Sequence, residues 1–87
     1  MAIVGGDVPA MFAFANELRR RRNNIEATTR RLAQLVEQAN WVEPDRDQFV
    51  REWQGNHGPS LMAIMEDIAE AANRIVNHAQ QQEQASR

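Results

Sequence analysis

The side chains most suited to catalysis in this chain are His57 and Ser60, which lie three positions apart. Nucleophilic catalysis needs a serine or threonine beside a histidine base, and an acid that orients the base. Here the pair lies in a segment interrupted by glycine and proline, with no glycine-rich oxyanion loop following a strand. The sequence therefore predicts no catalytic residue and no enzyme.

A second cluster of polar residues, Glu66, Asp67, Glu70 and His78, contains the types that bind metal ions. On a helix Glu66 and Glu70 are one turn apart, but His78 lies two turns further on and does not complete a ligand set. The chain has no cysteine, and two histidines are too few for a structural zinc site. We therefore expect neither a metal ion nor any other cofactor.

The only basic cluster is Arg19–Arg22, followed by Arg30 and Arg31. Four consecutive residues fan around about 300° of a helix, so they cannot form one patch. The net charge of −2, from ten basic and twelve acidic residues, gives no long-range attraction to nucleic acid. We expect no nucleic-acid partner; a DNA-binding or regulatory helical domain that uses these arginines, or an intracellular helical adaptor, is the alternative.

The first element that carries these residues is a helix predicted over 9–39, after a flexible start at 1–8. Asp7 can cap this helix, Pro9 suits its first turn, and no proline or glycine occurs between Ala10 and Glu43. One stripe at alternating spacings of three and four runs along it and is the predicted partner interface: Met11, Phe14, Leu18, Arg21, Ile25, Leu32 and Leu35. Arg21 lies in this stripe, so we expect it to pair with Glu66, Glu70 or a carboxylate of another chain.

The second arm is predicted in pieces. A turn at 40–45 contains Trp41, Pro44 and Asp45, and Asp45 can cap the short helix that follows over 46–54. Two glycines and a proline predict a break at 55–59, after which a last helix covers 60–80 and a glutamine-rich tail, 81–87, frays. The apolar residues of this last helix complete the predicted interface: Leu61, Met65, Ile68 and Ile75.

These elements predict one all-α domain over 1–87, an antiparallel helical hairpin with a kinked or split second arm. A chain of this length buries only about 60% of its unfolded surface, and its apolar faces are wider than one seam can cover. We therefore expect two hairpins to pair into a four-helix bundle. The alternative is a three-helix bundle that folds back at Gly58-Pro59. No stretch is apolar enough to span a membrane.

The Trp53-Gln54-Gly55 tripeptide, in a short helical chain without cysteine or a cleaved signal peptide, resembles the WXG family of type VII secretion substrates, the Esx-like proteins of Gram-positive bacteria. The resemblance covers the whole chain. It implies a Trp-x-Gly motif between two long helices and homodimers or heterodimers that form four-helix bundles. Trp53 and Gly55 fit the motif by identity. Trp41 fits it better by position, and Pro44, Asp45, Phe49 and Trp53 then resemble an actinobacterial variant, which we prefer.

At the turn, either tryptophan would fill the end of the bundle and offer its indole N–H to an exposed carbonyl. The family's export signal, Tyr-x-x-x-Asp/Glu, has no counterpart because the chain contains no tyrosine. The resemblance thus implies pairing with itself or with a related WXG-like protein, and contact with the secretion machinery through a partner that carries the signal. The expected location is outside the cell by the type VII route, or the cytoplasm before export.

Overall fold

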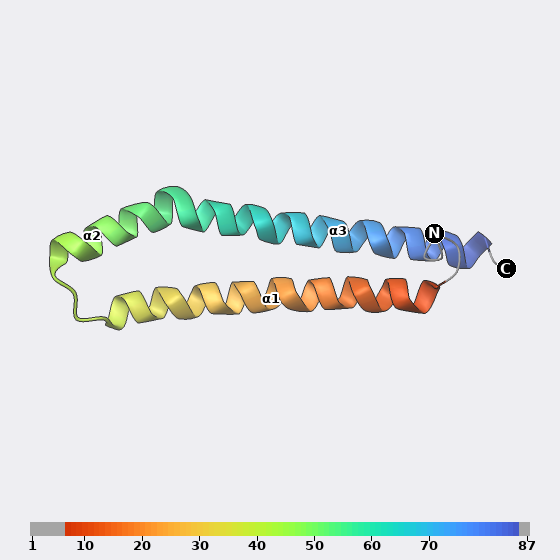
Figure 1. The fold of residues 1–87 in the computed structure, drawn as a ribbon, viewed down its shortest axis with the longest axis horizontal. Helices are drawn as coiled ribbons and strands as arrows, with labels where there is room; N and C mark the ends of the chain where they lie inside the picture. The colour runs from red at the N-terminus through yellow and green to blue at the C-terminus, as the bar shows by residue number, and fades with distance from the viewer. Residues whose placement is uncertain (1–6, 86–87) are drawn as a thin grey trace.

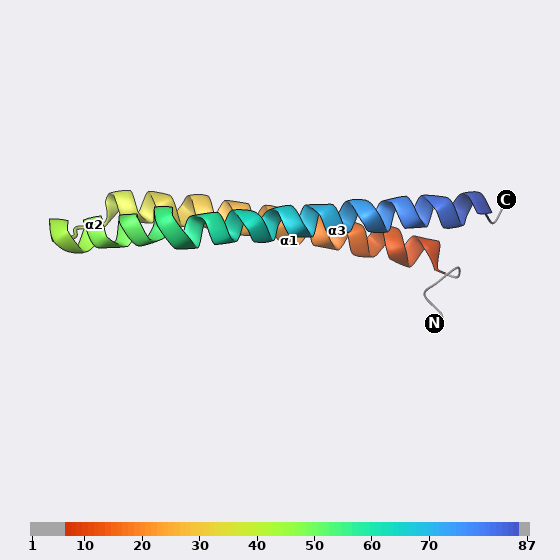
Figure 2. The ribbon, with the colours of Figure 1, turned by 90° about the horizontal axis from the view of Figure 1, so that it is seen from above.

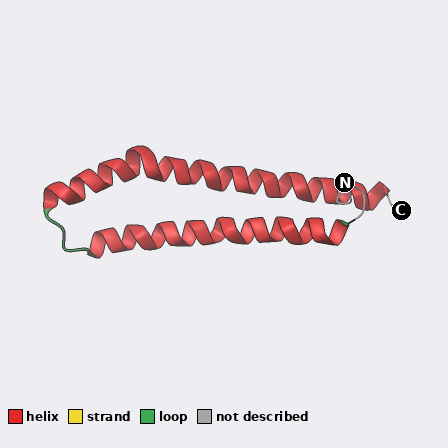
Figure 3. Ribbon diagram, viewed as in Figure 1, coloured by secondary structure: helices red, strands yellow, loops and turns green. Residues whose placement is uncertain are grey.

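The computed structural model describes residues 7–85, and within this range the chain is helical apart from Asp7 and one connection. Helix α1 spans Val8–Gln38, α2 spans Glu43–Glu52, the π-helix η1 spans Trp53–His57 and α3 spans Gly58–Ala85. α1 forms one arm of a hairpin, and α2, η1 and α3 follow one another without a gap to form the other (Figures 1 and 3). The two arms run antiparallel. Among the described residues there is no strand.

The molecule is a rod of 64 × 19 × 18 Å. Its radius of gyration is 19.0 Å, whereas a compact domain of this length would have about 12 Å. The chain therefore does not fold back at Gly58-Pro59, and the three-helix alternative is wrong. Figure 2 shows the two arms crossing at a shallow angle, as helices do when they pack along one seam.

The start of α1 follows from its capping residues. Asp7 accepts a hydrogen bond from the backbone N–H of Ala10 at 3.1 Å, and Pro9 occupies the first turn, where its missing N–H leaves no bond unmade. Of the flexible start predicted at 1–8, residues 1–6 lie outside the described residues, and Val8 belongs to the helix. The helix ends where Ala39 turns to extended backbone, with φ −70° and ψ 141°.

The connection between the arms is shorter than the predicted turn, because α2 begins at Glu43 rather than at 46. Pro44 lies in the first turn of α2, where its ring is tolerated. Asp45 was expected to cap this helix, but the N-cap residue is Val42, without a side-chain hydrogen bond. Asp45 instead lies in the first turn, where its negative charge favours the positive end of the helix dipole.

The predicted break at 55–59 is absent, since η1 joins α2 to α3 as continuous helix. Gly58 adopts helical angles, φ −61° and ψ −53°, and donates its N–H to the carbonyl of Trp53, five residues back. This wider turn moves the preceding carbonyls away from Pro59, which then occupies the first turn of α3 without the clash that a regular helix would impose. The second arm is therefore kinked rather than split, and Figure 1 shows the bend at this junction.

The π-turn also keeps both halves of the second arm in register with α1. Phe49, Val50 and Trp53 are half-buried in the first half, and Gly58 and Leu61 in the second. A regular seam would place its next position four residues after Trp53, but the structure uses five, and η1 accommodates the additional residue. The tail predicted to fray at 81–87 is helical as far as Ala85, and Gln82 is still half-buried.

Candidate partner interface

The fully buried positions of the seam between the arms are mostly small residues. Ala15, Ala72 and Ala79 are 0% exposed, and Met65 is 9% exposed; these four are the buried hydrophobic residues of the described chain. Alanine has no side-chain atom beyond Cβ, so helices can approach closely there at little entropic cost. The hairpin thus has a thin core and leaves its larger apolar side chains near the surface.

The seam of α1 follows a different line from the predicted stripe. Its residues alternate by three and four and are buried or half-buried: Met11, Ala15, Leu18, Arg22, Ile25 and Thr29. Only Met11, Leu18 and Ile25 belong to both lines. The remaining members of the stripe are all exposed: Phe14, Arg21 and Leu35 lie one position before the seam line, whereas Leu32 lies at its next position after Thr29. The second line was equally regular in the sequence but was missed, because Ala15, Arg22 and Thr29 are not large apolar residues.

The predicted interface residues of the second arm face α1 within the same hairpin. Met65 is buried, and Leu61, Ile68 and Ile75 are half-buried along one line of α3 that also contains Ala72 and Ala79. These residues therefore stabilise the hairpin itself. Only the part of each half-buried side chain that stays exposed is accessible to another chain.

Six large apolar side chains are exposed. Phe14 is 56% and Met62 60% exposed, and the complete set is Phe14, Leu32, Leu35, Val42, Met62 and Ile64. They come from both arms and from the connection, so they extend over most of the rod. Large apolar side chains that stay exposed around a thin buried core form the kind of surface that can bind a partner.

The grooves between the arms include two of about the same volume. The central groove, about 440 Å³, is lined by Arg21, Asn24, Ile25, Thr28, Thr29, Leu32 and Leu61. The turn groove, also about 440 Å³, lies where the arms approach the connection and is lined by Leu32, Ala33, Val36, Glu37, Arg46, Phe49, Val50, Trp53 and Gln54. Leu32 borders both, so they follow one another along α1. Arg46 and Glu37 approach within 3.5 Å at the rim of the turn groove.

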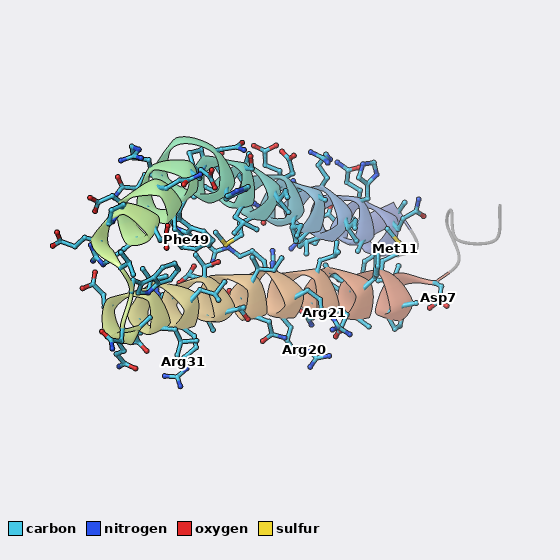
Figure 4. All side chains as sticks on the ribbon, turned by 60° about the vertical axis from the view of Figure 1, so that its left-hand side comes forward. Asp7, Met11, Arg20, Arg21, Arg31 and Phe49 are labelled. Atoms are coloured by element: carbon cyan, nitrogen blue, oxygen red, sulfur yellow. The ribbon has the colours of Figure 1, made fainter. Side chains whose placement is uncertain are left out.

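Three aromatic rings lie in contact at the connection end of the rod, with Phe49 stacked on Trp53 and tilted against Trp41. The ring centroids of Trp41 and Phe49 are 5.4 Å apart, and those of Phe49 and Trp53 are 6.1 Å apart. Trp41 lies in the connection, and Phe49 lies between the arms (Figure 4). Trp53 is the first residue of the π-turn, which also contains Gly55. The indole Nε1 of Trp41 is buried without a hydrogen-bond partner among residues 7–85, so the carbonyl acceptor expected for it is not found.

The arginine cluster is largely paired within α1. Arg20 and Arg21 both contact Glu17, at 2.7 and 2.9 Å, whereas Glu66 and Glu70 had been expected to pair with Arg21. Arg21 pairs within α1 because it lies beside the seam, where its side chain reaches Glu17 one turn back along the same helix. The hydrogen bond from Arg20 lowers the pKa of Glu17, outweighing the opposite effect of desolvation, and Arg21 lowers it further.

The next turns repeat this arrangement. Arg22, which does lie in the seam, pairs with Glu26 at 2.5 Å, and Arg30 pairs with the same carboxylate. Arg19 donates to the side-chain oxygen of Asn73 across the hairpin at 3.0 Å. Arg20 and Arg31 project from the side of α1 turned away from α3 (Figure 4). The cluster thus provides separate intrahelical pairs rather than one cationic surface.

No helix among residues 7–85 is both long and apolar enough to cross a membrane. The same residues contain no group of three or more histidine, cysteine or acidic side chains placed to hold a metal ion. No family model, curated protein or solved structure matches the chain. The candidate site is therefore defined by geometry alone, as the six exposed apolar side chains and the two grooves that follow one another along α1.

Proposed function

We propose that this chain is a non-enzymatic, WXG-like type VII secretion substrate or secretion-associated protein that acts by pairing its hairpin with a second hairpin. One observation carries the pairing: the seam buries alanines while six large apolar side chains stay exposed. Covering one such side chain completely is worth about 1.5–3 kcal/mol, and roughly half of that is still available at a half-exposed position. A four-helix bundle would cover both arms at once.

The secretion assignment rests on the sequence resemblance, and the hairpin is compatible with it. The connection contains Trp41, and Pro44 and Asp45 lie in the first turn of α2 that follows it; the Trp53–Gly55 tripeptide lies in the π-turn. Because the chain lacks tyrosine, export would require a partner that supplies the signal. Because Glu17 and Glu26 pair with four of the six arginines of the cluster, these arginines support the DNA-binding alternative less well.

Light-scattering mass over a range of concentrations, for the chain alone and with the product of the neighbouring gene, tests the pairing. We expect a dimer in at least one sample, and Phe14→Ser with Leu35→Ser should shift it to monomer while the helical circular dichroism is retained. A chain that remains a monomer in both samples would refute the pairing. Export is tested separately, by its presence in culture medium of strains with and without a functional type VII apparatus.

A further inference from the structure

Along one exposed line of α1, the order of apolar and polar residues is the same when it is taken from either end. Residues seven apart lie on one line of a helix, and the line beside the seam contains Phe14, Arg21, Thr28 and Leu35, which we call the α1 edge. In an antiparallel pair of such edges centred between Arg21 and Thr28, Phe14 of one copy meets Leu35 of the other. Arg21 then meets Thr28, so no like charges face each other on this line.

The neighbouring line of α1, one step further from the seam, is centred at Asn24, within half a residue of the centre of the first line. It contains Glu17, Asn24 and Arg31, all spaced by seven. In the same antiparallel arrangement Glu17 meets Arg31 of the other copy, and Asn24 lies on the two-fold axis opposite itself. Arg31 makes no ion pair with residues 7–85, so its guanidinium is available for this contact.

The seam side of the edge continues this symmetry. Ile25 lies next to Asn24 near the axis, and Leu18 and Leu32 each lie seven residues from Ile25, one on either side. Leu32 is 41% exposed, so much of its side chain is available to another copy. The central groove is lined by Arg21, Asn24 and Ile25, so it opens at the predicted axis. A two-fold interface between identical chains is reciprocal. If one residue of the first copy contacts a second residue of the other copy, the same two residues also meet with the copies exchanged.

We propose that the partner of this hairpin is a second copy of the same chain, packed antiparallel along the α1 edge with the two-fold axis at Asn24. This inference rests on the proposed pairing function and specifies its partner and register. The contacts are apolar at both ends, Phe14 with Leu35, and the flanking charges, Glu17 with Arg31, are complementary in this orientation.

A cysteine placed at the axis tests this register directly, because the chain has no cysteine of its own. Asn24→Cys should form a disulfide-linked dimer under mild oxidation, since two residues facing each other across a two-fold axis meet the short separation that the bond requires. Asn23→Cys is the matched control: it is the same exposed residue type, but it points to another side of α1. We expect cross-linking at least about tenfold faster at position 24, because the paired thiols have a high effective concentration.

Charge reversal supplies a second measurement. Arg31→Glu would place two glutamates together at both ends of the interface and should raise the dimer Kd roughly three- to thirtyfold, as expected for two surface ion pairs. Arg51→Glu makes the same charge change at an exposed site of α2 and should leave the Kd unchanged. Circular dichroism confirms that each variant is folded.

The outcomes separate this inference from the function on which it rests. A dimer that cross-links no faster at position 24 than at 23 would refute the register and leave the pairing function intact. A chain that is monomeric alone but pairs with the neighbouring gene product would refute self-pairing only. A chain that pairs with neither would refute both.

Discussion

The two glycines of the π-turn region should respond in opposite ways to the same substitution. Gly55 lies inside η1, and a Cβ built there meets nothing within 4 Å. Glycine in a helix is about 1 kcal/mol less favourable than alanine, so Gly55→Ala should stabilise the protein by roughly that amount. For a domain of this size the expected rise in Tm is about 4–8 °C.

At Gly58 the same methyl group would lie 2.9 Å from the backbone carbonyl oxygen of Trp53, the atom that accepts the Gly58 N–H. The helix-propensity gain is again about 1 kcal/mol, but forcing a methyl group into a packed site costs about 1–3 kcal/mol. Gly58→Ala should therefore lower the Tm relative to Gly55→Ala, by about 4–24 °C at the scale given above.

Thermal unfolding followed by circular dichroism, at one fixed protein concentration because of any coupling to association, measures both variants. The comparison depends on the difference, so effects of alanine on the unfolded chain cancel. If Gly58→Ala were as stable as Gly55→Ala, the Trp53 carbonyl would not approach residue 58, and the π-turn with its register argument would be wrong.

Three further predictions concern the ends, the seam and the charges of the rod. Asp7→Ala removes the acceptor of the Ala10 N–H and should lower stability by about 1 kcal/mol in urea unfolding. Ala72→Leu overpacks the seam and should cost about 1–3 kcal/mol, whereas Ala63→Leu, at an exposed position of α3, should be nearly neutral; equal losses would contradict the assigned seam. Because the pKa of Glu17 is lowered in the folded protein, the contribution of its carboxylate to stability is present above the ordinary pKa of 4.5 and is lost as the pH falls through the folded-state pKa. The Tm difference between wild type and Glu17→Gln should therefore shrink in acid. A difference that stays constant with pH would contradict this role of Glu17.

The all-helical class, the antiparallel hairpin and a second arm that is kinked or split could be predicted from the sequence. Uninterrupted apolar periodicity and clustered glycine and proline residues indicate where the backbone is helical and where it bends. The start of α1 also follows from local chemistry, since Asp7 and Pro9 satisfy the first turn by themselves. Such features need no knowledge of what lies across the hairpin.

The register of α1 could not be predicted in the same way. Two lines of residues alternate by three and four, and the stripe chosen from the sequence had the larger apolar side chains, Phe14 and Leu35 among them. The hairpin instead uses the line with Ala15, because close approach of two helices favours small residues where a partner backbone lies directly opposite. Hydrophobicity identified residues that need to be covered, but not which element covers them.

The π-turn was missed for a related reason. Gly55, Gly58 and Pro59 indicate a break when they are considered locally, yet one additional residue in a wider turn satisfies Pro59 and also maintains the contacts with α1 on both sides. The energy that decides between a break and a π-turn comes from those contacts, which the local sequence does not contain.

The alanine seam has a consequence for how this chain can vary. The residues that hold the hairpin together, Ala15, Ala72 and Ala79, occupy different lines from those that stay exposed, such as Phe14 and Leu35. Substitutions along the exposed lines can therefore change the surface of the rod while the rod keeps its shape. Under the proposed pairing, duplicated genes encoding such a hairpin would diverge in specificity without passing through an unfolded intermediate, whereas the seam itself would tolerate almost no increase in size.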